Sequence, residues 1–127
     1  MERVQGIGGV FFKSRNPKVL AAWYKQHLGV PVESWGGASF RWRELDARGE
    51  ASTAWSLFPE DTTYFAPGTA SFMVNYRVDD LAAMIAQLRA GGVEVDEKIE
   101  ESEFGKFGWG LDPEGNRFEL WESPPSL

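Results

Sequence analysis

Few side chains in this sequence could carry out acid–base or metal chemistry. The chain has no cysteine and a single histidine, His27, which excludes a thiolate metal site, a cysteine nucleophile and a multi-histidine site within one chain. Among the carboxylates, Glu119 stands out because it lies between Phe118 and Leu120 in a short apolar segment. A carboxylate in such a place is a candidate general base, or a polar anchor for a ligand.

The segment around Glu119 is predicted to be a strand, since it follows the turn-forming residues 112–116. Side chains alternate across a strand, so Arg117, Glu119 and Trp121 share one face. That face is either the floor of a cavity or a solvent-facing surface on which Arg117 pairs with Glu119.

The other predicted elements occur twice in the same order: a strand, a capped helix with a glycine stop, and further strands. His27 falls at the end of the first helix, where we expect it only to favour the helix dipole. The predicted elements are strands at 7–13, 39–45, 52–58, 72–78, 107–111 and 117–122, a turn at 46–49, a helix capped by Asn16 and ended by Gly29, and a helix capped by Asp79 or Asp80 and ended by Gly91 and Gly92.

The two halves also match in sequence. Residues 29–33 match residues 92–96, and the same offset carries 56–58 onto 119–121. Matching elements in the same order indicate an internal duplication. With 127 residues and 43% hydrophobic content, the chain is predicted to be one folded domain whose two facing sheets enclose a central space.

Charge and hydropathy exclude several classes of partner. The net charge of -6 opposes both a nucleic-acid backbone and an anionic membrane surface. No signal-peptide pattern is present, and no apolar run approaches the roughly 18 residues of a spanning helix. A cytoplasmic location is therefore expected. The acidic residues between 94 and 103 lack the pattern of a calcium loop, and we expect a solvated loop there.

Aromatic and cationic side chains supply the remaining site candidates. The chain has six tryptophans, most of which we expect in the core. If Ser56 faces inward, then Trp55 faces outward, so Trp121 is the better cavity candidate. Three cations on predicted strands could bind a substrate carboxylate, although isolated cations on strands usually face solvent: Lys13, Arg41 and Arg43.

Several motifs together resemble the vicinal oxygen chelate superfamily of glyoxalases, bleomycin-resistance proteins and extradiol dioxygenases. They are residues 9–13, the pairs Asn16-Pro17, Trp23-Tyr24 and Leu28-Gly29, and the closing segment 111–121. The resemblance implies an α+β fold in which two βαβββ modules form a curved mixed-sheet cup with helices outside. It also implies a single glyoxalase-like domain over 1–127, with modules at about 4–66 and 70–123, and a homodimer.

Metal-dependent members of that superfamily place one ligand on the first and one on the last strand of each module, drawn from His, Glu and Gln. In this sequence the resemblance puts those positions at Gly9 or Gly8, Ser56, Met73 or Phe72, and Glu119. Only Glu119 is a suitable ligand, whereas a catalytic divalent ion needs about three protein ligands. No cofactor is therefore expected.

The sequence thus predicts a glyoxalase/bleomycin-resistance-like protein that binds a small, partly apolar molecule in an aromatic-lined cavity, without a catalytic metal. The alternatives are a lyase, isomerase or dioxygenase that uses Glu119 as a metal ligand or general base, and an interaction module without a ligand. Cavity shape depends on strand register and dimer geometry, so the ligand's identity does not follow from sequence. The predicted ligand-binding residues are Glu119, Trp121, Arg117, Ser56, Phe58, Phe11 and Met73.

Overall fold

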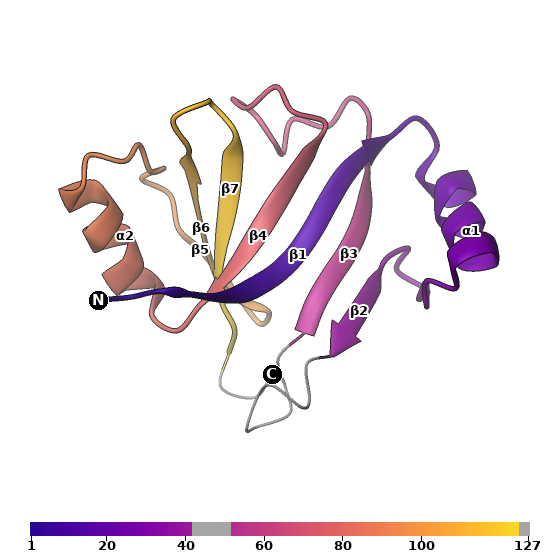
Figure 1. Ribbon diagram of the computed structural model, residues 1–127, viewed down its shortest axis with the longest axis horizontal. Coiled ribbons are helices and arrows are strands. Elements are labelled where there is room, and N and C mark those ends of the chain that lie inside the picture. Colours follow the sequence, from indigo (N-terminus) through magenta and orange to yellow (C-terminus); the bar gives the residue numbers. More distant parts are fainter. Residues whose placement is uncertain (42–51, 125–127) are drawn as a thin grey trace.

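The computed structural model describes residues 1–41 and 52–124, and over these ranges the chain forms one curled sheet and two helices (Figure 1). The elements in chain order are β1 (Val4–Ser14), α1 (Pro17–Leu28), β2 (Ala38–Arg41), β3 (Ser52–Pro59), β4 (Phe72–Val78), α2 (Leu81–Ala90), β5 (Glu100–Ser102), β6 (Gly105–Leu111) and β7 (Arg117–Glu122). The strand order in the sheet is β2-β3-β1-β4-β7-β6-β5.

The two halves of the chain meet in the middle of this sheet. β1 and β4, the first strands of the two halves, pair antiparallel with each other. Each also pairs in parallel with the last strand of its own half, β1 with β3 and β4 with β7. The mixed, curved sheet of the predicted α+β class is therefore confirmed.

Local sequence signals set the helix ends where they were predicted. The Asn16 side chain accepts a hydrogen bond from the Val19 N–H, and Gly29 ends α1 in the left-handed conformation with φ of 67°. Only glycine adopts that conformation without a steric penalty. Asp80, rather than Asp79, caps α2 by accepting from the Ala83 N–H.

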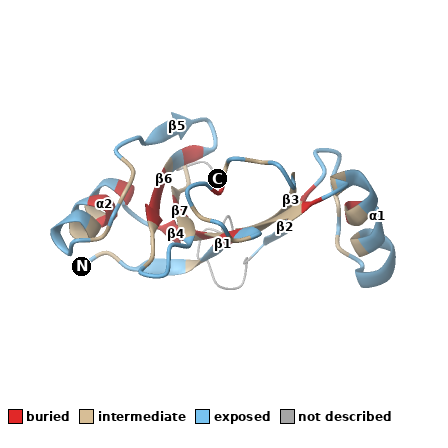
Figure 2. Ribbon diagram, turned by 90° about the horizontal axis from the view of Figure 1, so that it is seen from above, coloured by how far each residue is buried: buried red, intermediate tan, exposed pale blue. Residues whose placement is uncertain are grey.

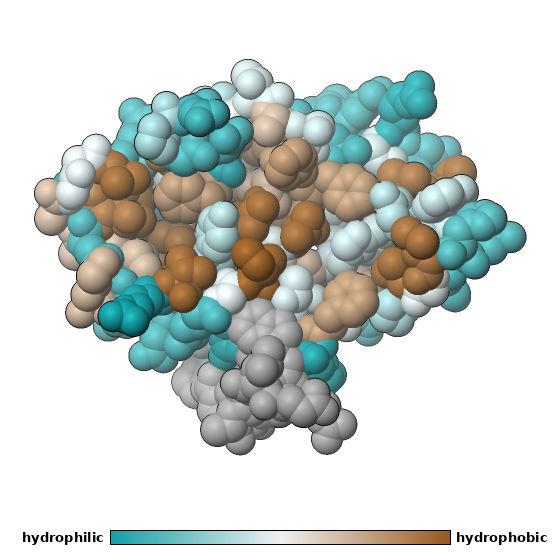
Figure 3. All heavy atoms as spheres, viewed as in Figure 1, coloured by the Kyte–Doolittle hydropathy of each residue, from teal (hydrophilic) through white to brown (hydrophobic). Residues whose placement is uncertain are grey.

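Both helices pack on the outer face of the sheet, near its two ends (Figure 2). Tyr24 of α1 packs edge-on against Trp55 of β3, which confirms that Trp55 faces outward. α2 buries Leu81, Met84 and Ile85 against Val78 and Leu120. Between the helices, apolar side chains gather over the middle of the sheet (Figure 3).

A second core lies on the concave face. Here Phe65, Met73 and Trp109 are buried, with Phe11, Phe58, Tyr64 and Phe107 packed against them. Phe65 and Tyr64 belong to the segment between β3 and β4, so this connection lies over the concave face and closes part of it.

The acidic stretch differs from its prediction. A loop was expected, but residues 100–102 form β5, which pairs antiparallel with β6. All three of its residues are exposed, so backbone pairing alone forms this strand and no apolar alternation marks it in the sequence. The predicted turn at 46–49, the end of the strand predicted at 39–45, and Arg43 lie outside the described residues. No described helix combines the length and apolar character needed to cross a membrane.

Candidate functional site

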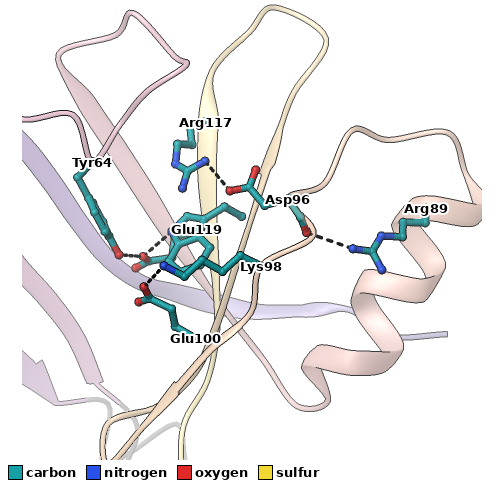
Figure 4. A network of polar contacts seen from close by, with 8 residues as sticks. Tyr64, Arg89, Asp96, Lys98, Glu100, Arg117 and Glu119 are labelled. Carbon is teal, nitrogen blue, oxygen red and sulfur yellow. Dashed lines mark hydrogen bonds and ion pairs between the residues drawn. The ribbon is translucent and has the colours of Figure 1, made fainter.

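Glu119 lies at the centre of the concave face, where it is 2% exposed. It projects from β7 between Asn75 of β4 and Trp109 of β6, its direct neighbours in the sheet. Three side chains donate hydrogen bonds to its carboxylate: Tyr64 through its hydroxyl (Figure 4), Trp109 through Nε1 at 2.8 Å and Asn75 through Nδ2 at 2.6 Å. Both oxygens of the carboxylate thus already accept hydrogen bonds within the protein.

Burial dominates the electrostatics of this group. It raises the pKa of Glu119, although the three hydrogen bonds and the nearby Arg117 charge act in the opposite direction. Burial also raises the pKa of the Tyr64 hydroxyl, and the negative charge of Glu119 raises it further. Tyr64 therefore stays protonated at neutral pH and remains a hydrogen-bond donor to Glu119.

Arg117 does not pair with Glu119. Its Nη1 forms an ion pair with Asp96 Oδ2 at 3.1 Å, and its guanidinium lies 5.3 Å from the centre of the Trp109 ring. The alternative in which Glu119 faces solvent or pairs with Arg117 is therefore wrong. Asp96 belongs to the acidic segment between residues 94 and 103, which was expected to be a solvated loop. Its ion pair nevertheless holds Arg117 near Glu119 (Figure 4).

The strand register differs from the expected one. In β4 the residue opposite Glu119 is Asn75, two positions beyond Met73. In both halves the first-strand residue opposite this last-strand position lies five residues before the helix cap, Phe11 before Asn16 and Asn75 before Asp80. The expected positions, Gly9 and Met73, each lie two residues earlier. Against β4, β1 has register shifts between Val4 and Gly6 and between Ile7 and Gly9, where bulges insert extra residues into one strand.

Gly8 makes room for this arrangement. A Cβ at Gly8 would lie 2.1 Å from Asn75 Oδ1 and 3.2 Å from Trp121 Cε3, which is far inside van der Waals contact for the first pair. The Asn75 carboxamide therefore occupies the space into which a first-strand side chain would project. Its Oδ1 is buried without a hydrogen-bond partner.

The other predicted site residues lie on the same concave face but are packed rather than open. Met73 is 1% exposed, and Phe11 and Phe58 contact each other with ring centres 5.6 Å apart. Ser56 lies opposite Phe11 in the β1–β3 pairing. The structure therefore packs Met73, Phe11 and Phe58 together with Tyr64 and Phe65 in the core of the concave face.

The described residues do not fit a bound divalent ion. In residues 1–41 and 52–124, no three His, Cys, Asp or Glu side chains lie close enough together to hold one. The carboxylate of Glu119 already accepts hydrogen bonds from three donors. Its neighbours supply no further charged ligand, because Asn75 carries a neutral amide and the facing positions of β1 are glycines. Divalent metals in this type of site need several anionic or imidazole ligands.

An open cleft of about 650 Å³ lies on the concave face between the two halves, beside Glu119 and its three hydrogen-bond donors. Trp121, a predicted site residue, forms part of its wall. The described residues around it are Trp35, Ser39, Arg41, Ser52, Ala54, Phe104 and Trp121.

Sequence reasoning missed Tyr64, Asn75, Trp35 and Phe104 as site residues, and it placed Trp109 on a strand without linking it to Glu119. The link between Trp109 and Glu119 has a visible signal, because a hairpin about the turn at 112–116 pairs these two positions. Asn75 and Tyr64 have no such signal, since they reach Glu119 from elements distant in the chain.

Residues 9–121 match the model of a family described as a glyoxalase-like domain. None of the curated proteins compared with the chain matches it. Among solved structures, the chain is similar to methylmalonyl-CoA epimerase from Mycobacterium tuberculosis, with 22% identity, a TM-score of 0.67 and coverage of 98% of this chain and 91% of that chain.

Two further structures agree on the fold. A Streptomyces coelicolor methylmalonyl-CoA epimerase in complex with 2-nitronate-propionyl-CoA has 16% identity and a TM-score of 0.69, covering 95% of this chain and 99% of that one. A glyoxalase/bleomycin resistance protein/dioxygenase superfamily member from Vibrio splendidus has 11% identity and a TM-score of 0.55, covering 97% and 100%.

Proposed function

Because this chain belongs to the glyoxalase-like domain family, we propose that it binds a small, partly apolar organic molecule in the cleft between its two halves, without a catalytic metal. The observation that carries this proposal is the lining of the cleft, where Trp35, Phe104 and Trp121 converge around about 650 Å³. Sites for small molecules have this size and this predominantly apolar character.

An enzyme that uses Glu119 as its general base has less support. A base must reach the proton that it removes, directly or through one water. Glu119 is 2% exposed and does not line the cleft, while its oxygens already accept three hydrogen bonds. Its raised pKa follows from burial in the core. Glu119 is therefore better explained as a structural residue, whose hydrogen bonds connect β7 with the neighbouring strands and with the segment that carries Tyr64.

Saturation-transfer NMR with a library of neutral, cationic and anionic aromatic fragments tests the proposal. We expect a subset to bind the wild-type protein and to lose its signal with Trp121→Ala. Trp23→Ala is the matched control, because Trp23 is half exposed on α1 and lies outside the cleft. If no fragment binds, or if Trp121→Ala leaves binding intact, the proposal fails.

Calorimetric titration with zinc, nickel, manganese and iron(II) tests the metal part of the proposal. We expect no tight site, and one tightly bound ion per chain would contradict it. The homodimer and the cytoplasmic location stay predictions, and sedimentation equilibrium would test the first of them.

A further inference from the structure

We propose that the cleft selects planar organic anions, namely aromatic or conjugated ring systems that carry a carboxylate. This inference rests on the proposed function, since it assigns a ligand class to the same cleft. Three observations carry it: aromatic rings that come from both halves, backbone geometry that holds two of those rings, and a single charged side chain among the described residues of the wall.

Trp35 is held in place by its own turn. The Glu33 N–H donates to the Gly37 carbonyl at 2.7 Å and the Gly36 N–H donates to the Glu33 carbonyl at 2.9 Å. A Cβ at Gly37 would lie 2.2 Å from Trp35 Cζ3, so the indole rests directly over the glycine backbone. The ring nevertheless remains 55% exposed. Trp35 therefore presents a flat apolar surface whose position is fixed without burial.

Trp121 forms the second fixed ring, on the side of the other half. Its Nε1 donates to the Phe104 carbonyl at 2.8 Å, and its ring stacks on Phe107 with an angle of 12° between the planes. Gly105, with φ of +120°, permits this approach, because a Cβ there would lie 2.8 Å from Trp121 Nε1. Binding a flat ligand therefore requires little ordering of either ring, which favours affinity.

Arg41 supplies the charge. It is the one charged side chain among the described residues that line the cleft, and it forms no ion pair within residues 1–41 and 52–124. A guanidinium matches a carboxylate through two parallel hydrogen bonds. The hydroxyls of Ser39 and Ser52 line the same wall and can act as further donors. No described carboxylate borders the cleft, although the chain as a whole carries a net charge of -6.

The ring system and the charge together define the ligand class. A neutral aromatic molecule would leave Arg41 without a partner, and a cation would face its positive charge. A saturated, puckered ring would contact the flat indoles over less of their area. The cleft therefore fits a fused or conjugated ring system, with its carboxylate directed toward Arg41 of β2.

Calorimetric titration with three matched probes, 2-naphthoate, 2-naphthamide and 2-naphthylmethylammonium, tests the inference. We expect 2-naphthoate to bind at least about tenfold more tightly than 2-naphthamide, because its bond to Arg41 is charge-assisted. The ammonium probe should bind most weakly. Arg41→Gln should reduce the preference for 2-naphthoate to within about threefold, and raised salt should weaken it. Trp35→Ala should weaken both 2-naphthoate and 2-naphthamide.

Two control variants make the result specific. Arg15→Gln removes an exposed cation outside the cleft and should leave all affinities unchanged, and circular dichroism checks that Arg41→Gln stays folded. Equal binding of 2-naphthoate and 2-naphthamide, or a preference that survives Arg41→Gln, overturns the anion inference and leaves the proposed function standing. If none of the probes and no library fragment binds, the proposed function itself has failed.

Discussion

Replacing Glu119 distinguishes a structural tie from a catalytic base. Glu119→Leu places an apolar side chain of similar size in a site that is 2% exposed. It removes the carboxylate that accepts three hydrogen bonds. The hydroxyl of Tyr64, the indole N–H of Trp109 and the amide of Asn75 all lose their partner. Tyr64 is only partly buried, whereas Trp109 and Asn75 are 3% exposed.

Each buried donor left without a partner costs about 1–3 kcal/mol of stability. Glu119→Leu leaves two such donors, but it also removes the cost of burying a carboxylate, which offsets part of the loss. We therefore expect the free energy of unfolding to fall by about 3 kcal/mol. Glu119→Gln behaves differently. Its carbonyl can replace Oε2 and accept from Tyr64 and Trp109, while its amide can donate to Asn75 once that side chain turns its unpartnered Oδ1 inward. We expect this variant to lose less than about 1 kcal/mol.

Urea unfolding, followed by tryptophan fluorescence and circular dichroism, measures both variants. Glu114→Leu is the matched control, because Glu114 is exposed on the turn before β7, and it should change stability by less than about 0.5 kcal/mol. If Glu119→Leu and Glu119→Gln lose the same free energy of unfolding, the hydrogen-bond account is refuted. If Glu119→Gln retains stability but abolishes a later discovered reaction, Glu119 acts as a base after all.

Three further predictions follow from the same contacts. Burial raises the folded-state pKa of Glu119 above its ordinary value of 4.5, so the folded protein binds the extra proton between these two pKa values. The stability that proton binding at Glu119 adds is therefore fully present below pH ~4.5 and is lost as pH rises through the folded pKa. Unfolding titrations should show this pH dependence flattened in Glu119→Gln. Gly8→Ala should lower the free energy of unfolding in urea by roughly 1–3 kcal/mol, because its Cβ would lie 2.1 Å from Asn75 Oδ1. A smaller loss than that of a glycine-to-alanine change at an exposed position would contradict this contact. Asn16→Ala should lose about 1 kcal/mol through the missing cap of α1, with Thr or Ser at that position restoring most of it.

Much of the fold could be predicted from the sequence because its signals are local. An Asn-Pro pair starts α1 and a glycine ends it, and both interactions involve residues within one or two helical turns. The bounds of β7 match their prediction, since the turn at 112–116 fixes where the strand begins. Alternation along β3 correctly placed Trp55 outward, because the side-chain period of a strand does not depend on its partners.

The site could be predicted only in part, because it depends on register between strands that are distant in sequence. β4 and β7 are parallel neighbours joined through a helix and two further strands, and no turn fixes which residue stands opposite Glu119. Tyr64 was missed for a related reason, since the path of the segment between β3 and β4 is decided by packing of Phe65 in the inner core.

The pair Gly8 and Asn75 explains why a metal ligand would be difficult to introduce at this position of β1. A histidine introduced at Gly8 would place its Cβ 2.1 Å from Asn75 Oδ1, so the carboxamide would have to leave. That movement breaks the 2.6 Å hydrogen bond from Asn75 Nδ2 to Glu119 Oε1. The buried carboxylate then loses the donor to that oxygen, which is unfavourable. Trp121, whose Cε3 lies 3.2 Å from the same Cβ position, would also shift, and with it one wall of the cleft. A metal ligand at Gly8 therefore requires coordinated changes at three positions, whereas the present arrangement keeps Glu119 hydrogen-bonded and Trp121 in place.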